Sequence, residues 1–392
     1  MAEKAKRLVL MGKGGPWELQ EFDIPHPGPN QILVKVMAAT ICNQTDLNTI
    51  KGLHPAHDHQ LFGMLPHHLR MRYGDLSKDP LADCYRAPHP FEPYPTTMGH
   101  EAMGIVVEVG PRDGETYPYG VQDSQGIVNL EKGTDGIDDS DFKVGDRVTI
   151  MGAMGSFGEY AICNIGTAAH VPDGVMDEVA AYVEMISFCN LMPRETLKYG
   201  QSVAILGSGV VGSLCTMFAR KLYNAGMIIA VDPQPFKRER ALGYGADYAI
   251  DPNEVNPIDF IMEKTHGAGV DVCIECIGVP ESVRIIPYIM RQGGSVCQIG
   301  AGCVPAYIDW SYIHFKGLNV ISTNTVYNRY GITKGLRTGT SVLLDPRVKK
   351  DLESIITQRI PLTVEATNEI FRKIDQGNEV LKACYLPWKK DW

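Results

Sequence analysis

The stretch Val203-Ala204-Ile205-Leu206-Gly207-Ser208-Gly209-Val210-Val211-Gly212 decides the fold of this chain. Its four apolar residues predict a short buried strand, and the G-x-G-x-x-G pattern that follows predicts a tight turn into a helix. Gly207 permits the turn, Gly209 lets the backbone approach a pyrophosphate, and Gly212 lets the helix pack closely on the sheet. The free N–H groups at the start of the helix favour an anion. We therefore predict a dinucleotide site formed by Gly207, Ser208, Gly209, Val210, Val211 and Gly212.

Strands and helices alternate through the rest of this half of the chain. We expect strands at 228–231, 248–250, 270–277, 295–299 and 319–322, and helices at 177–197, 213–224 and 237–243. Such alternation is typical of βαβ units, which build a parallel sheet. The sequence therefore predicts an α/β protein with a doubly wound sheet in this region.

Asp232 ends the strand that follows the glycine turn. A carboxylate there can accept hydrogen bonds from both ribose hydroxyls and repels a 2′-phosphate, which favours NAD over NADP. Two alternatives remain open. The nearby cations Lys237, Arg238 and Arg240 could bind a phosphate, and Asp232 could simply cap the helix that follows Pro233.

The first 175 residues have a different pattern. Short strands expected at 8–10, 31–39, 104–109 and 147–150 indicate a β-rich domain, and prolines at 25, 27 and 29 mark the loop before the second. Two stretches, 52–97 and 111–141, look like insertions, and long loops of this kind often cover a binding site. The tail adds a helix near 364–376 and a strand near 383–386.

Composition limits the function classes. A chain of 392 residues is long enough for two domains, and a net charge of −9 argues against a nucleic-acid partner. No apolar run approaches the length of a membrane span, and the charged N-terminus does not look like a secretory signal. We therefore expect a cytoplasmic protein with no membrane partner and with reduced cysteines. Cys273 and Cys276 lie in an apolar run and are interpreted as part of a buried strand.

Cys42, His100 and Glu184 supply a thiolate, an imidazole and a carboxylate. Three such ligands around zinc leave a fourth position open, as in catalytic zinc sites. There a metal polarises an alcohol oxygen and lowers its pKa, so that hydride can pass to a nicotinamide.

Neighbouring residues extend this candidate site. Thr45 could relay the alcohol proton, Asp46 could fix the tautomer of His100, and Glu101 could join or leave the metal sphere. The bland alternatives are a buried apolar role for Cys42 and a simple turn at Gly99-His100-Glu101. A carboxylate such as Glu184 inside an apolar helix is costly unless it is paired or binds metal.

These residues resemble the zinc-dependent medium-chain alcohol dehydrogenase superfamily, over nearly the whole chain. The resemblance rests on motifs in both halves: 31–36, Cys42 with Thr45-Asp46, Gly99-His100-Glu101, 106–110, 142–148, 158–160, the glycine turn, Asp232, 245–247 and 275–278. It implies a GroES-like catalytic domain at 1–175, a Rossmann NAD-binding domain at 176–325 and a C-terminal return to the catalytic domain at 326–392.

The resemblance also implies roles for individual residues. Ile277, Gly278 and Ile299 would lie near the nicotinamide, and Glu184 stands where the polyol, sugar and threonine dehydrogenases carry a glutamate. This favours a small-molecule substrate that is a polar secondary alcohol or its ketone. Members of the family are usually homodimers or homotetramers, and we expect one of these states.

Three features depart from the family pattern. Two residues separate Cys42 from Thr45, where one is usual. The four-cysteine lobe that usually follows Gly-Asp-Arg-Val is missing, so we expect one catalytic zinc and no structural zinc. The two insertions have no usual counterpart.

The competing hypotheses are a zinc-free, NADPH-dependent enone or quinone reductase of the same superfamily, and a non-catalytic nucleotide-binding protein.

Overall fold

The computed structural model of the chain describes residues 3–52, 94–112, 141–153, 155–300, 306–323, 332–377 and 379–392. The two expected insertions therefore lie mostly outside the described residues. The chain forms two compact units. Unit 1 consists of Met1–Glu184, Gly331–Thr340 and Ile356–Trp392, and unit 2 of Met185–Tyr330 and Ser341–Ile355.

Unit 2 is built on a parallel sheet of β9 (Ser202–Leu206), β10 (Met227–Val231), β11 (Tyr248–Ile250), β12 (Val270–Glu275), β13 (Met290–Gln298) and β14 (Asn319–Ser322). The strand order is β11-β10-β9-β12-β13-β14, and every neighbouring pair is parallel. This is the order of doubly wound dinucleotide-binding folds, in which the direction of winding reverses between the first and fourth strands. The predicted α/β fold class is confirmed.

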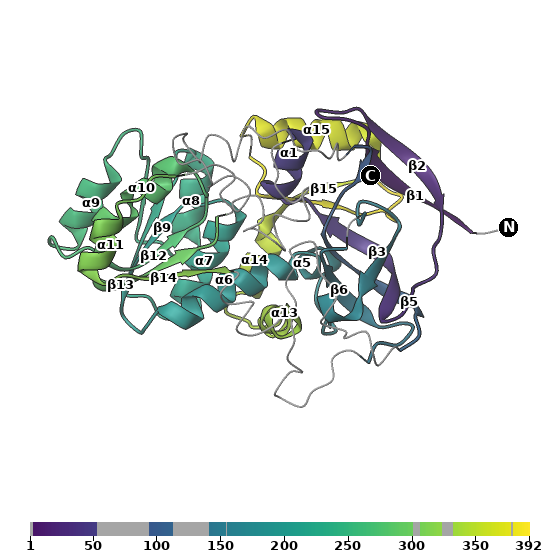
Figure 1. Cartoon of the computed structure of the whole chain (residues 1–392), viewed down its shortest axis with the longest axis horizontal. Helices are drawn as coiled ribbons and strands as arrows, with labels where there is room; N and C mark the ends of the chain where they lie inside the picture. The colour runs from purple at the N-terminus through teal and green to yellow at the C-terminus, as the bar shows by residue number, and fades with distance from the viewer. Residues whose placement is uncertain are drawn as a thin grey trace, which may run out of the picture. The chain divides into compact units, whose positions relative to one another are not determined.

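The helices of unit 2 form two groups. They are α6 (Val183–Thr196, which begins in unit 1), α7 (Val210–Lys221), α8 (Pro235–Gly243), α9 (Pro257–Lys264), α10 (Pro280–Ile289), α11 (Trp310–Lys316) and α14 (Lys349–Ile355). α7 contacts α8 and α14, whereas α10 contacts α9 and α11 (Figure 1). Because winding reverses between β9 and β12, the two groups cover opposite faces of the sheet.

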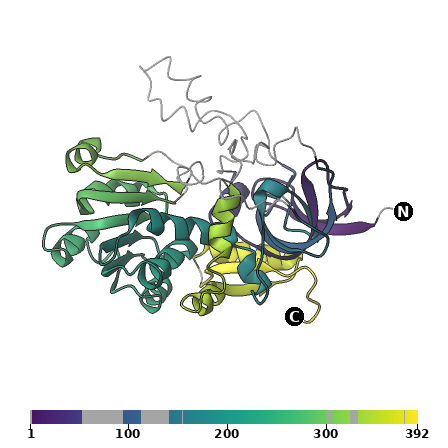
Figure 2. The ribbon, with the colours of Figure 1, turned by 90° about the horizontal axis from the view of Figure 1, so that it is seen from below.

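Unit 1 is rich in antiparallel strands. They are β1 (Lys4–Leu10), β2 (Trp17–Asp23), β3 (Gln31–Thr40), β4 (Thr96–Thr97), β5 (Glu101–Val109), β6 (Arg147–Met151), β7 (Tyr160–Asn164), β8 (Ala168–His170), β15 (Ile356–Ile360) and β16 (Lys382–Tyr385). One sheet has the order β2-β1-β4 and the other β15-β16-β3-β5-β6-β8, with β7 also paired to β3. Figure 2 shows the yellow C-terminal strands beside the earlier strands of this unit.

Short helices complete unit 1. They are α1 (Thr45–Ile50), the 3₁₀ turn Ile165–Thr167, α5 (Asp177–Ala180), α13 (Ile332–Thr340) and α15 (Val364–Asp375). The core between strands and α15 is apolar, and its largest members include Phe157 and Tyr385, whose ring centroids lie 4.8 Å apart. This packing joins the first and last parts of the chain in one core.

Some boundaries differ from the sequence expectation. The helix expected at 177–197 is two helices, α5 and α6, interrupted at residues 181–182. The expected domain limit at 175/176 compares with a unit boundary after Glu184, and the tail returns to unit 1 in two pieces because 341–355 belongs to unit 2. That segment packs on α7, where Lys221 forms an ion pair with Asp351. None of the helices in the described residues has the length and apolar character needed to span a membrane.

Candidate active site

Cys42, His100 and Glu101 come together in unit 1. Glu101 is the first residue of β5 and is paired in register with Thr40 at the end of β3, which places Cys42 close by. One donor atom from each of the three residues lies within 4.8 Å of the others. The turn before His100 requires glycine, because Gly99 has φ +90° and an added Cβ would lie 2.5 Å from the Phe157 ring. The geometry therefore gathers a sulfur, a nitrogen and an oxygen donor.

Asp46 fastens two of these residues from the first turn of α1. Its Oδ2 accepts a hydrogen bond from the Cys42 backbone N–H at 2.9 Å, and its Oδ1 lies 3.6 Å from His100 Nδ1. Burial opposes the imidazolium, but the Asp46 and Cys42 side chains outweigh it and raise the pKa of His100 well above its ordinary value. Asp46, which is 2% exposed, is thus placed to orient the imidazole.

Glu101 has two oxygens in different surroundings. Oε2 accepts hydrogen bonds from Thr40 Oγ1 at 2.6 Å and from Lys382 Nζ at 2.5 Å. Oε1 is buried, accepts no hydrogen bond from the described residues, and lies 3.8 Å from His100 Nε2. Burial favours the neutral acid, but Lys382, His100 and Thr40 outweigh it and lower the pKa of Glu101. The carboxylate is therefore ionised and keeps one oxygen available.

Sequence reasoning missed Lys382 and Thr40. Lys382 is 1% exposed, and although burial disfavours its ammonium, the neighbouring Glu101, Cys42 and Asp46 raise its pKa. A signal was present in the sequence, since Lys382 interrupts the apolar run from Val380 to Cys384. A cation in such a run is costly to bury unless it is paired.

Two further predicted site residues also belong to unit 1. Glu184 is buried in the first turn of α6, but it is not a member of the group formed by Cys42, His100 and Glu101. Thr45 is the first residue of α1, and its carbonyl accepts a hydrogen bond from Thr49. The ligand role of Glu184 and the relay role of Thr45 stay predictions.

In unit 2 the glycine turn connects β9 to α7 as the motif predicts. Gly207 has φ +91°, and an added Cβ would lie 2.5 Å from the Ile277 side chain. A Cβ on Gly212 would lie 1.8 Å from the carbonyl oxygen of Gly207, whereas one on Gly209 would meet nothing within 4 Å. Gly209 is the N-cap of α7, and Val210 and Val211 open the helix. The turn thus leaves open space at the one glycine that should face a pyrophosphate.

Asp232 connects this turn to the end of β10. Its Oδ2 accepts a hydrogen bond from Ser208 N at 2.8 Å, and its Oδ1 accepts one from Gln234 N at 2.9 Å. Arg238, which was considered as a partner for a 2′-phosphate, forms an ion pair of 2.8 Å with Asp251. The carboxylate of Asp232 therefore stands at the turn itself, while this arginine already has an anionic partner.

The residues expected near a nicotinamide lie at the carboxyl ends of β12 and β13. Ile277 and Gly278 donate backbone hydrogen bonds to the side chain of Glu275, and Ile299 donates one to its carbonyl. Glu275 is fully buried and also accepts hydrogen bonds from Ser282 and Gln298. Glu275 was included in the motif at 275–278, but its role in fixing the loops after both strands was not predicted from the sequence.

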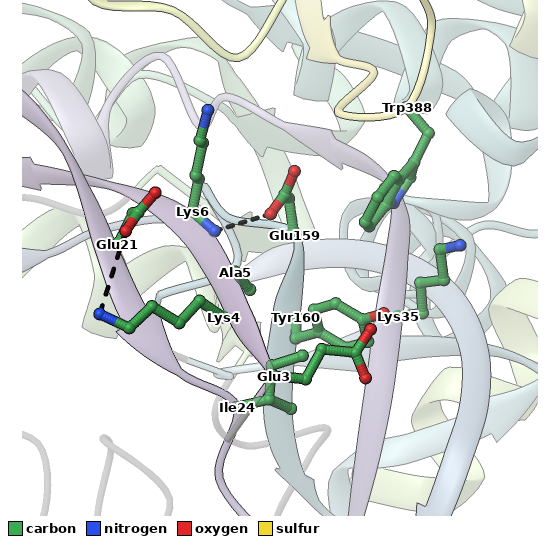
Figure 3. A pocket seen from close by; sticks show the side chains of 10 residues that line it. All are labelled: Glu3, Lys4, Ala5, Lys6, Glu21, Ile24, Lys35, Glu159, Tyr160 and Trp388. Carbon is green, nitrogen blue, oxygen red and sulfur yellow. Dashed lines mark hydrogen bonds and ion pairs between the residues drawn. The ribbon is translucent and has the colours of Figure 1, made fainter. Parts of the chain in front are cut away.

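A separate pocket of about 380 Å³ lies on unit 1 (Figure 3). Among its lining residues, Lys6 N donates to Glu159 Oε2, and Lys35 Nζ lies 4.1 Å from the centroid of the Trp388 ring. Charges of both signs line it. It contains none of the candidate metal ligands and is not part of the candidate active site.

Comparison with known proteins places these features in a family. The model of the alcohol dehydrogenase GroES-like domain matches residues 28–188, and that of the zinc-binding dehydrogenases matches residues 210–337. The chain belongs to the zinc-dependent medium-chain alcohol dehydrogenase superfamily. The resemblance inferred from the sequence motifs is confirmed.

Relatives agree with this membership. An L-threonine 3-dehydrogenase of Thermococcus kodakarensis is 29% identical over 82% of each chain, and a sorbitol dehydrogenase of Halalkalibacterium halodurans is 25% identical over 76% of this chain and 78% of its own. Among solved structures, 2R,3R-butanediol dehydrogenase of Bacillus subtilis aligns with a TM-score of 0.69 and 22% identity, covering 98% of this chain and 99% of its own. A zinc-binding dehydrogenase of Sinorhizobium meliloti bound to NADP aligns with a TM-score of 0.69 and 24% identity, over 98% and 100%. These structures share the fold of this superfamily.

Proposed function

We propose that this alcohol/ketone oxidoreductase requires zinc and NAD, and transfers a hydride between NAD and a polar secondary alcohol or its ketone. The observation that carries the proposal is the group of Cys42, His100 and Glu101, in which Glu101 Oε1 is buried and receives no hydrogen bond from any residue that the structure describes. A buried carboxylate oxygen that lacks a donor is costly, and a metal ion would satisfy it.

The donor set fits zinc. Thiolate, imidazole and carboxylate are the ligands that zinc binds in proteins, and three of them leave a position for substrate. Cys42, His100 and Glu101 would hold the zinc, and Glu184 is our candidate for a further ligand. Zinc would supply Lewis-acid polarisation of an alcohol oxygen. Asp46 holds the imidazole of His100 in one orientation. Thr45, in the first turn of α1, is our candidate for moving the alcohol proton outward.

The glycine turn fits a nicotinamide dinucleotide. The open space at Gly209 and the free N–H groups at the start of α7 suit a pyrophosphate. Asp232 favours NAD, because its carboxylate would bind the ribose hydroxyls and repel a 2′-phosphate. The partnered state of Arg238 supports the same preference.

The substrate class is inferred from the names of two relatives and from one residue of this chain. Two relatives carry the names L-threonine 3-dehydrogenase and sorbitol dehydrogenase, and both names denote substrates with polar hydroxyl groups. Together with the glutamate at position 184, they favour a polyol or another polar secondary alcohol.

The first test is the metal content of the purified protein, measured by elemental mass spectrometry after dialysis against metal-free buffer. We expect about one zinc ion per chain, lost in Cys42→Ala. Cys163→Ala is the matched control, because Cys163 is also a buried cysteine of unit 1 but is not a member of the group formed by Cys42, His100 and Glu101. Absence of metal even after reconstitution with zinc would contradict the proposal and favour a zinc-free reductase. Bound zinc and tight NAD binding without turnover of any alcohol would favour a non-catalytic role.

We also propose a homodimer or homotetramer assembled through unit 2. Trp310 and Phe315 on α11 are 68% and 79% exposed, and Val320 on the edge strand β14 is 47% exposed. β14 is the last strand of its sheet among the described strands, and exposed apolar groups beside a sheet edge are typical of interaction sites. Sedimentation equilibrium should give a dimer or tetramer that dissociates in a Phe315→Ser variant. Leu19→Ser, on β2 of unit 1, serves as the control, and a monomeric native protein would refute the assembly.

A further inference from the structure

Three neighbouring strands of unit 1 bring a buried ion pair to the candidate metal group. β16 pairs with β3, and β3 pairs with β5, so that Lys382, Thr40 and Glu101 come from three successive strands of one sheet. The side chains of Lys382 and Glu101 are 1% and 0% exposed. The pair is therefore removed from water and lies within the wall of the site.

Both donors bind the same carboxylate oxygen. Lys382 Nζ lies 2.5 Å and Thr40 Oγ1 2.6 Å from Glu101 Oε2. Within the described part of the chain, Glu101 Oε1 accepts no hydrogen bond, and it belongs to the group with Cys42 and His100. One carboxylate oxygen of Glu101 is thus held by two donors, whereas the other is available to bind a metal ion.

A role in stability alone explains this arrangement poorly. A buried ion pair is often no more stabilising than apolar residues of similar size, because both charges lose their hydration. Carboxylates that bind metals, in contrast, are commonly held by hydrogen bonds from surrounding residues.

We propose that Lys382 is a positioning residue, which with Thr40 anchors Glu101 Oε2 so that Glu101 enters the metal sphere through Oε1 alone. This inference rests on the proposed function, since it needs a metal at Cys42, His100 and Glu101. Lys382 itself touches neither substrate nor cofactor in this role.

The test is titration of the metal-free protein with Co²⁺, which suits the same donors and has visible absorption. In the native protein we expect a thiolate-to-cobalt band and saturable binding. Lys382→Met keeps the length of the side chain but removes its charge, and should weaken Co²⁺ binding by about 10- to 100-fold and shift the ligand-field bands. Lys382→Arg keeps the cation and should restore most of the affinity.

Lys316→Met is the matched control. Lys316 is half-buried in unit 2 and donates to the carbonyls of Pro287 and Met290, so its loss tests the effect of removing a lysine elsewhere. It should leave cobalt affinity and spectrum unchanged. If Lys382→Met fails to fold, Thr40→Val carries the test, because it removes only the second anchor of Oε2 and should weaken binding and shift the same bands in the same direction.

The outcomes separate this inference from the function on which it rests. A native protein without a cobalt band would overturn the metal site and the positioning role together. Native binding with an unchanged affinity and spectrum in Lys382→Met would overturn the positioning role alone. In that case a lower melting temperature would assign Lys382 to stability only.

Discussion

Separate replacement of Gly209 and Gly212 by alanine should distinguish an effect on nucleotide binding from an effect on folding stability. An added Cβ at Gly212 would lie 1.8 Å from the backbone oxygen of Gly207, which cannot move without opening the turn. At Gly209 nothing lies within 4 Å of the added Cβ, and φ is −64°, a value that alanine adopts freely. The two substitutions are chemically identical, but only one is tolerated by the protein without ligand.

The magnitudes follow from these contacts. In Gly209→Ala a small loss at the helix N-cap is offset by the lower entropy of the unfolded chain, so the melting temperature should change by less than about 2 °C. Its Cβ would keep the backbone from a bound pyrophosphate. Loss of one hydrogen bond to a charged group costs about 1.5–3 kcal/mol, which corresponds to about 10- to 100-fold weaker NAD binding. Overpacking in Gly212→Ala should cost about 1–3 kcal/mol or more.

The assay combines thermal unfolding with calorimetric titration of NAD for the native protein and both variants. We expect Gly209→Ala to melt like the native protein but to bind NAD weakly, and Gly212→Ala to melt several degrees lower. Native NAD affinity in a well-folded Gly209→Ala variant would refute the reasoning, because the pyrophosphate would then lie elsewhere.

Three further predictions concern single side chains. Asp232→Asn should reduce the preference for NAD over NADP by about tenfold, measured as a ratio of dissociation constants, because the charge that repels a 2′-phosphate is lost; an unchanged ratio would assign selectivity to other residues. Burial opposes ionisation of Asp271, but hydrogen bonds from Ser202 and Arg291 outweigh it and lower its pKa below the ordinary 3.8. The native protein should therefore be more stable than Asp271→Asn above about pH 4, with a difference that shrinks as the pH falls through the lowered pKa; melting curves that differ equally at pH 7 and pH 3 would contradict this. Tyr385→Phe should lower stability by about 1 kcal/mol through loss of the 3.0 Å hydrogen bond to Thr367 Oγ1, without changing cobalt affinity.

The fold of unit 2 was predictable because its signals are local. The strands 202–206, 248–250 and 319–322 were expected with the limits that the structure has, and each is a short run built around apolar or β-branched residues. The glycine turn identified the strand before it as the one that leads into the dinucleotide site. The local sequence pattern was sufficient to predict a strand wherever the residues of that strand carried the signal themselves.

Elements that depend on distant contacts were not predictable. The interruption between α5 and α6 falls among residues 179–183, all of which are buried, so no periodicity marks it. The segment 341–355 joins unit 2 through the ion pair of Asp351 with Lys221 and through buried Leu352 and Ile355. Asp351 and Lys221 lie far apart in the sequence, and the local sequence around one of them does not identify the other.

The residues of the candidate site were likewise predictable only in part. Cys42, His100 and Glu101 were proposed from the residue types and their spacing, and the structure gathers them. Glu184 was proposed with them but lies outside that group. The apolar run around Lys382 indicated that this lysine is buried and paired, but its partner Glu101 lies far away in the sequence and could not be identified from the local pattern.

The pairing of Lys382 with Glu101 also gives a reason for the return of the last part of the chain to unit 1. Glu101 is buried in one group with Cys42 and His100, and among the described residues Lys382 is the fully buried ammonium that pairs with it. Its strand, β16, completes the sheet beside β3. The return of the last part of the chain to unit 1 therefore does more than cover apolar surface. It brings the counter-charge that lets a carboxylate remain ionised in the interior, with one oxygen held and the other open.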